Sequence, residues 1–309
     1  FGVFGAAAAA AKSLELGRSE TAMAIALSGV QAAGLKAAFG SDAKPYLAGR
    51  TAAAGVEAAM LAACGISGPP AVLEDSRGFL ALFNDGVRDD QGVMQLGKVW
   101  RLADPGIFFK QFPVCSGAHA AVETAIGLLR TNRIARADVE RVICEVPPVV
   151  AISLVYDRPA TPQQAQFSMP YGIAAILVHG DLTVSSISES ALRDPRMAEA
   201  MAKVEMRRVD SLHDDAAPEG ARVTIRTRDG RELSAYLGKP SGMPGNPLSD
   251  ADLRRKFLRC AAIGGVDGAA ASRLLERLGV IETCTSLADV FSVSQHDARA
   301  AQSPARRGF

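Results

Sequence analysis

Small apolar residues repeat at helical spacing along the first hundred positions of the chain. In ETAMAIALSGVQAAGL they recur every three or four residues after Ser19, which predicts a helix capped by that serine. The same spacing predicts a helix over about 4–15 and another over TAAAGVEAAMLAACG that ends at Gly65, while GFLALFNDG predicts a short one. Because alanine and glycine let helices approach closely, we expect residues 1–104 to form a tightly packed helical array.

Over residues 105–247 the pattern of apolar and polar positions predicts strands as well as helices. SGAHAAVETAIGLLR and FSMPYGIAAILVHG carry apolar residues at three- and four-residue spacings and predict helices, the second of them capped by Ser168. VERVICEVPP predicts a strand, and DPRMAEAMAKVEM predicts a helix capped by Asp194. ARVTIRTRDGRELSAYLG alternates as a hairpin does, with Asp229-Gly230 at its turn. These elements predict an α+β unit.

Helical periodicity returns over residues 248–309, after the linker KPSGMPGNPLSD. Ser249 and Asp252 stand in a capping-box arrangement, and SRLLERLG and SLADVF predict further helices. The order helical, mixed, helical predicts an all-α helical domain, formed by 1–104 and 248–309, with an inserted α+β lid domain. A ligand is then expected in a cleft between the two domains.

Charge and composition exclude several classes of partner. The 309 residues carry 34 Lys plus Arg and 33 Asp plus Glu, without a run of like charge, so we expect neither nucleic acid nor a membrane surface as a partner. No apolar stretch approaches the roughly 20 residues that span a bilayer. Five cysteines without a CxxC pair predict a reducing, cytoplasmic setting, and four histidines without HxxxH or HExxH spacing predict no metal site.

The stretch SDAKPYLAGR concentrates candidate binding residues. Because Pro45 disfavours the helical region for the residue before it, Lys44 is predicted to lie outside the helix, at its entrance. A cation held there, with Arg50 six residues on, suits an anionic carboxylate substrate. The alternative is a solvated surface lysine. Ser41 and Lys44 also match SxxK, the nucleophile motif of serine acyl-enzymes, but Pro45 breaks the helical spacing that this chemistry needs, so we interpret the match as chance.

Three further residues can carry chemistry. Cys115 and His119 stand four residues apart in the predicted first turn of one helix, where the helix dipole would favour a thiolate. A buried structural cysteine and a hydrogen-bonded core histidine are the alternatives. Tyr171 begins another helix, where its hydroxyl could orient a carboxylate or transfer a proton, or its ring could simply pack. The phosphate-binding patterns GxGxxG and GxxxxGK[ST] are absent from the sequence.

Three separated segments carry a joint resemblance to a known family. They are KPYLAGRTAAAGVEAAMLA with GPPAVLEDSRGFL, then KQFPVCSGAHAAVETAIGLL, and finally AQFSMPYGIAAILVHGDL. Together they resemble the MmgE/PrpD family, which includes 2-methylcitrate dehydratase, cis-aconitate decarboxylase and iminodisuccinate epimerase. The resemblance is colinear over essentially the whole chain, and DGRELSAYLGKPSGMPGNPLSDADLRRKF extends it through the hairpin.

The resemblance implies a homodimeric enzyme that needs no metal or organic cofactor, with a helical domain and an inserted α+β lid. It implies that Lys44 and Tyr171 lie at the active cleft, and His119 matches a histidine common in the family. It also implies that Asp and His active-site residues of the family precede the chain's first segment, FGVFGAAAAAAK. In the decarboxylase branch the position matching Cys115 is a histidine, so the resemblance favours loss of water over loss of carbon dioxide.

The function predicted on this basis is a cofactor-independent lyase like 2-methylcitrate dehydratase. It abstracts a proton α to a carboxylate of a small di- or tricarboxylic acid and then eliminates water. Lys44 stabilises the charge that develops, Arg50 anchors a carboxylate, and His119 or Tyr171 transfers a proton, with Cys115 beside them. The alternatives are an epimerase of an amino-dicarboxylate and a truncated, non-catalytic family member.

Overall fold

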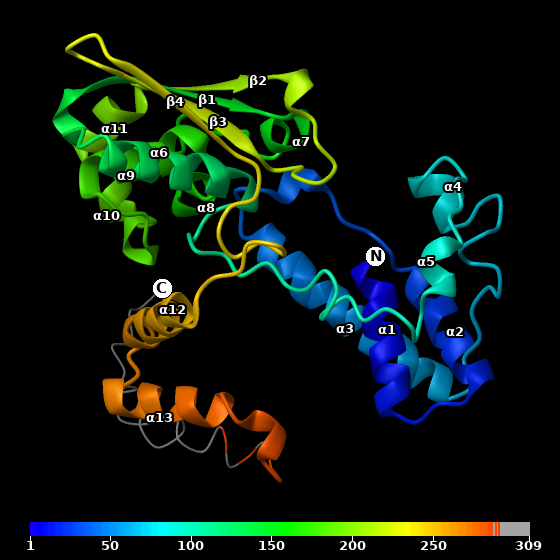
Figure 1. Ribbon diagram of the computed structural model, residues 1–309. Helices are drawn as coiled ribbons and strands as arrows, with labels where there is room; N and C mark the ends of the chain where they lie inside the picture. The colour runs from blue at the N-terminus through cyan, green and yellow to red at the C-terminus, as the bar shows by residue number, and fades with distance from the viewer. Residues whose placement is uncertain (287, 289, 291–309) are drawn as a thin grey trace, which may run out of the picture. The chain divides into compact units, whose positions relative to one another are not determined.

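The computed structural model describes residues 1–286, 288 and 290 (Figure 1). Half of the predicted helix SLADVF, residues 287, 289 and 291, and His296 therefore lie outside the described residues. The chain divides into two compact units. The first comprises residues 1–106 and 112–238, and the second comprises residues 107–111 and the chain from 239 onward.

Helices alone make up the N-terminal part of the first unit. They are α1 (Gly2–Ser13), α2 (Arg18–Gly29), α3 (Ala43–Ala63), α4 (Phe79–Phe83) and α5 (Gln91–Met94), with a 3-10 turn, η1, at Lys36–Ala38. The close packing expected from small residues is confirmed where α3 crosses α1. A Cβ atom added at Gly55 would lie 2.4 Å from the Cβ of Ala6, so only glycine permits this approach of the backbones.

The boundaries of these helices differ from the prediction at two points. The helix α2 begins at Arg18 rather than after Ser19, since Glu20 accepts a hydrogen bond from the amide of Gly17 (2.8 Å) and so supplies the cap. The helix α3 begins at Ala43, far ahead of the stretch TAAAG where it was predicted. Its predicted end is confirmed, because Gly65 follows the last turn with a φ of +84°.

A four-stranded sheet organises the rest of the first unit, in the order β2-β1-β3-β4. Its strands are β1 (Val139–Val146), β2 (Val204–Arg208), β3 (Ala221–Thr227) and β4 (Glu232–Leu237). The predicted hairpin is confirmed, with β3 and β4 antiparallel and Gly230 at the turn. Along β3 alternate residues are buried, so one face of the sheet packs on helices (Figure 1).

The helices beneath the sheet bury most of the core. They are α6 (His119–Thr131), α7 (Pro148–Ala151), α8 (Pro162–Ala165), α9 (Met169–His179), α10 (Glu189–Leu192) and α11 (Pro195–Met201). Both predicted caps are confirmed, because Ser168 accepts the amide of Tyr171 and Asp194 accepts the amide of Arg196. The prediction that the last helix continues through Val204 is wrong. The chain turns there into β2, which pairs in parallel with β1 and satisfies its backbone groups in the sheet.

The second unit contains α12 (Asp250–Ile263) and α13 (Gly268–Leu278). Ser249 caps α12 as predicted, accepting the amide of Asp252 at 3.2 Å. Within this unit the amide of Phe109 donates to the carbonyl of Gly242 (2.9 Å) and the ammonium of Lys256 donates to the carbonyl of Lys110. The segment 107–111 is thereby joined to the C-terminal part of the chain.

The architecture is a mixed α/β fold with separate helical and sheet-bearing regions. The description of the α+β region as an inserted lid, with domain boundaries at 104/105 and 247/248, stays a prediction. Across the part of the chain that the structure describes, every helix is too short or too polar to cross a bilayer.

Candidate functional site

Lys44 lies in the first turn of α3, one residue after the helix begins. The prediction that Pro45 would keep Lys44 out of the helix is wrong. Proline lacks an N–H group, but the amides of a first helical turn have no partner within the helix, so Pro45 costs no hydrogen bond there. The amide of Lys44 donates to the carbonyl of Ser41 (3.3 Å), which closes the turn leading into α3.

Two aromatic rings hold the Lys44 ammonium at the surface. Its Nζ atom lies 5.6 Å from the ring centroid of Phe39 and 5.8 Å from that of Phe167. The two rings stack on each other with centroids 4.9 Å apart and planes at 22°. The ring faces attract the cation without neutralising its charge, and Lys44 itself is exposed. The positive charge is thus positioned and remains accessible to an anion.

Side chains from a distant part of the sequence fix this arrangement. The hydroxyl of Tyr156 donates to the carbonyl of Phe39 (2.8 Å), and the amide group of Gln163 donates to the carboxylate of Asp42 (2.8 Å). Gly40 has a φ of +77°, and a Cβ atom there would lie 2.4 Å from the ring of Tyr156. The loop before α3 therefore depends on a glycine and on contacts with residues more than a hundred positions away.

The SxxK match has no nucleophilic geometry in the structure. The hydroxyl of Ser41 donates to the backbone carbonyl of Ala38 at 2.7 Å. The ammonium of Lys44 faces the phenyl rings described above. The hydroxyl proton of Ser41 is directed to a backbone acceptor, which agrees with the interpretation of the match as chance.

Arg50 lies on α3 but faces a different direction from Lys44. At about 100° per residue, six positions place the two side chains about 120° apart around the helix axis. The guanidinium of Arg50 lies 3.9 Å from the carboxylate of Glu57, and both side chains are about half exposed. The structure does not bring Arg50 to the Lys44 ammonium.

Cys115 connects to the aromatic segment beside Lys44. It is half-buried at the start of a 3-10 turn, η2 (Ser116–Ala118), and its amide donates to the carbonyl of Gln166 (2.8 Å), the residue before Phe167. His119 begins α6 and is fully buried, with its ring edge-on to Phe112 at 5.3 Å. These contacts place Cys115 nearer the surface than His119, and the catalytic roles of both stay predictions.

Tyr171 is buried in the core within α9. Its hydroxyl donates to the backbone carbonyl of Ser186 (2.6 Å), and burial raises the pKa of the phenol to about 12. A proton held in this way is poorly placed for transfer to a substrate near neutral pH. The geometry agrees with the alternative of a packing aromatic, whereas a proton-transfer role for Tyr171 stays a prediction.

One carboxylate beside Cys115 was not found from the sequence. Glu219, from the loop between β2 and β3, accepts a hydrogen bond from the hydroxyl of Ser116 at 2.8 Å. The two residues are 103 positions apart, and neither belongs to a recognisable motif. Only the folded chain brings this acidic group to the start of α6.

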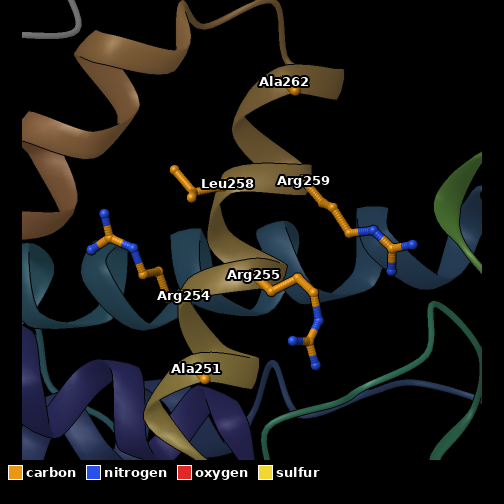
Figure 2. A pocket seen from close by; sticks show the side chains of 6 residues that line it. All are labelled: Ala251, Arg254, Arg255, Leu258, Arg259 and Ala262. Carbon is orange, nitrogen blue, oxygen red and sulfur yellow. The ribbon is translucent and has the colours of Figure 1, made fainter.

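Lys44 is not among the residues that line two of the surface hollows. One, of about 530 Å³, runs along α12 in the second unit, where Figure 2 shows the guanidinium groups of Arg254 and Arg259 pointing to opposite sides. Arg255, on the same face, is paired with Asp252. All the residues that line this hollow belong to one helix. It is therefore an open helix face.

A second hollow, of about 680 Å³, lies in the first unit beside α9 and β2. Its lining includes Asp157, Arg158 and Glu205. The pKa of Glu205 is lowered to about 2, mainly by hydrogen bonds from Arg207 and Arg141. This carboxylate is already neutralised by its own arginines. Within the described part of the chain, no three His, Cys, Asp or Glu side chains are grouped as a metal site requires.

Comparison with known proteins relates both regions of the first unit to one family. Residues 1–91 match the model of the MmgE/PrpD N-terminal domain, and residues 112–278 match that of the MmgE/PrpD C-terminal domain. Phe39 and Lys44 thus fall in the first match and Phe167 falls in the second.

Curated relatives carry related names. Cis-aconitate decarboxylase of Mus musculus is 26% identical over 262 residues, which make up 83% of this chain and 53% of the relative. Its counterpart in Homo sapiens is 27% identical over 266 residues, 83% of this chain and 54% of the relative. Cis-aconitate decarboxylase-like protein oryM of Aspergillus oryzae is 25% identical over 310 residues, which cover 95% of this chain and 63% of the relative. The chain spans about half the length of the two mammalian relatives.

Proposed function

The chain belongs to the MmgE/PrpD family, and on that premise we propose that it forms part of a lyase acting on a small di- or tricarboxylic acid. The observation that carries the proposal is the ammonium of Lys44. It is exposed, it is held by Phe39 and Phe167, and it lies where the two family-model matches meet in the first unit. A fixed and accessible cation is what binding of a carboxylate needs.

The chemistry follows from the position of this charge. When a proton leaves the carbon α to a carboxylate, the electron pair of the C–H bond moves into that carboxylate, which becomes a doubly charged aci-carboxylate. In dehydration this pair then forms a C=C bond as the β-hydroxyl group leaves with a proton as water. The positive charge of Lys44 stabilises the doubly charged aci-carboxylate more strongly than it stabilises the singly charged carboxylate of the substrate. This difference lowers the free-energy barrier to proton abstraction.

Decarboxylation is the second candidate, because the curated relatives are named cis-aconitate decarboxylases. There the C–C bond to a carboxylate breaks, carbon dioxide leaves, and the electron pair remains on carbon until a proton is added. A remaining carboxylate beside that carbon would need the same cationic partner. Lys44 has the same role in both reactions, and the proposal requires neither a metal nor an organic cofactor.

We do not assign Arg50 to this site, because it faces another side of α3 and lies by Glu57. Cys115 and Glu219 are the polar groups that we expect near the substrate, since Glu219 accepts a hydrogen bond from Ser116, the residue after Cys115, and Cys115 is joined to the segment that carries Phe167. The enzyme is proposed to act in the cytoplasm, as its unpaired cysteines predict.

Substitution of Lys44 tests the proposal. The purified protein and its Lys44→Ala variant are incubated with citrate, 2-methylcitrate and cis-aconitate, and products are followed by ultraviolet absorption of new alkenes and by release of carbon dioxide. We expect kcat/KM to fall by about 10²- to 10³-fold in the variant, the range seen when one electrostatic stabiliser is lost. The product separates dehydration from decarboxylation.

Lys12→Ala is the matched control, because Lys12 is an exposed lysine on α1 with the same charge. Binding of citrate, measured by calorimetry, gives a readout independent of turnover. Unchanged binding and turnover in Lys44→Ala, or an equal loss in Lys12→Ala, would contradict the role of Lys44.

A further inference from the structure

Tyr156 makes hydrogen bonds to both aromatic residues that hold Lys44. It lies between α7 and α8, and its hydroxyl donates to the backbone carbonyl of Phe39 at 2.8 Å. Its own backbone amide donates to the carbonyl of Phe167 at 3.3 Å. One residue thus joins the two segments of the chain that carry the rings.

The side chain of Tyr156 sets the distance between these two segments. Because the hydroxyl stands at the far end of a rigid ring, it lies at a fixed distance from the backbone of Tyr156 in every rotamer. Gly40, the residue after Phe39, is buried, and a Cβ atom added there would lie 2.4 Å from the Tyr156 ring. The loop before α3 therefore packs directly on this ring and ends its approach there.

The position of the Lys44 ammonium depends on both phenyl rings. The lysine side chain is long and flexible, and it samples many rotamers when nothing holds it. The Nζ atom lies 5.6 Å from the ring centroid of Phe39 and 5.8 Å from that of Phe167, close to the limit of about 6 Å at which a ring attracts a cation. A small displacement of either ring would therefore release the ammonium from it.

We propose that Tyr156 is a positioning residue for Lys44, because it holds the rings of Phe39 and Phe167 at the separation at which both attract the ammonium. Its effect on turnover rests on the proposed function, in which Lys44 binds the substrate carboxylate. Tyr156 acts through Lys44 and not on the substrate, since its hydroxyl proton is directed to the carbonyl of Phe39.

The other long-range hydrogen bond to this loop has a different role. The side chain of Gln163 donates to the carboxylate of Asp42 at 2.8 Å, and Asp42 is exposed, so water competes for this bond. Asp42 carries no ring and directly precedes α3. This bond holds the start of the helix, whereas the two bonds of Tyr156 hold the rings.

Magnetic resonance of the Lys44 side chain tests the positioning independently of turnover. Reductive methylation with isotope-labelled formaldehyde gives each lysine a methyl signal and keeps its charge, and a Lys44→Arg variant identifies the signal of Lys44. We expect the ring currents of Phe39 and Phe167 to shift this signal away from that of the exposed Lys12. In Tyr156→Phe, which keeps the ring and loses the hydroxyl, the signal should return toward that of Lys12.

Tyr236→Phe is the matched control for this measurement. It removes the same atom from a tyrosine on β4 that is 45% exposed, and it should leave the Lys44 signal unchanged. Three results would overturn the proposal: a Lys44 signal that coincides with that of Lys12 in the unsubstituted protein, a signal that Tyr156→Phe does not move, or an equal movement in Tyr236→Phe.

A double-mutant cycle tests whether Tyr156 acts through Lys44. With the carboxylic acid that gives turnover, we expect Tyr156→Phe to lower kcat/KM by about three- to tenfold, the loss typical of one hydrogen bond. In the Lys44→Ala background the same substitution should cause no further loss, because no ammonium is left to position. An equal loss in both backgrounds would show a merely structural role and refute the proposal.

The two measurements separate this inference from the proposed function. If Lys44→Ala alone left kcat/KM unchanged, the proposed function would fail, and the methyl signal of Lys44 would still decide whether Tyr156 positions the ammonium. If Lys44→Ala lost turnover while Tyr156→Phe changed neither kcat/KM nor the signal, only the role of Tyr156 would fail.

Discussion

Every residue of α9 from Met169 to Ile176 is buried, whereas α3 is buried on one face and exposed on the other. A helix that is apolar all round is typical of a core, and a helix with one buried face leaves the other available for ligands or partners. Tyr171 in α9 donates its hydroxyl to a backbone carbonyl, while Lys44 in α3 keeps an accessible charge. A polar side chain near the start of a helix is thus hydrogen-bonded within the core in one region and exposed to solvent in the other.

The strongest test of this comparison is the removal of the Tyr171 ring. Tyr171→Ala leaves a cavity in the core, so we expect the free energy of unfolding to fall by about 3–5 kcal/mol. Tyr171→Phe keeps the ring and removes only the hydrogen bond to Ser186, for which we expect a loss of about 1–3 kcal/mol. Urea denaturation measures both values. A loss for Tyr171→Ala no larger than that for Tyr171→Phe would show that α9 is not close-packed.

A smaller effect is expected at the loop that positions Lys44. Gly40→Ala introduces a side chain at a positive φ and against the ring of Tyr156, so we expect a loss of roughly 2–4 kcal/mol in the free energy of unfolding. Gly65→Ala is the matched control, because Gly65 has a similar φ and no described atom within 4 Å of the added Cβ. It should lose only about 1 kcal/mol. Equal losses would mean that the contact with Tyr156 does not constrain the loop.

The smallest effect concerns stability at alkaline pH. Burial raises the pKa of the Cys144 thiol to about 12, so the folded protein keeps this proton at a pH where the unfolded chain, with a thiol pKa of about 8.5, releases it. The stability that the protonated Cys144 thiol contributes is fully present below the pKa of this thiol in the unfolded chain. It is lost as the pH rises toward the pKa of the thiol in the folded protein. Replacing Cys144 with alanine should therefore make the decline of stability between about pH 8.5 and 10.5 shallower.

The exposed Cys64 provides the control for this measurement. Urea midpoints across the pH series should give Cys64→Ala the same slope as the unsubstituted protein. If Cys144→Ala also left the slope unchanged, the Cys144 thiol would not be protected from ionisation by its burial.

Local signals in the sequence predicted many element boundaries. The caps at Ser168, Asp194 and Ser249 and the turn at Gly230 were all found, because each rests on hydrogen bonds or dihedral angles within a few residues. The strand β2 and the start of α3 were missed. Both depend on partners outside the local segment, β1 in one case and the residues that hold the loop before Lys44 in the other.

The sequence by itself determined the family, the helix caps, the hairpin and the identity of Lys44 as a candidate cation. Only the tertiary structure decided what surrounds that cation. Phe167, Tyr156 and Gln163 reach the start of α3 from more than a hundred positions away, and Glu219 reaches Ser116 in the same manner. Such contacts leave no local pattern, because they arise from packing between segments whose separation in the sequence carries no periodic signal.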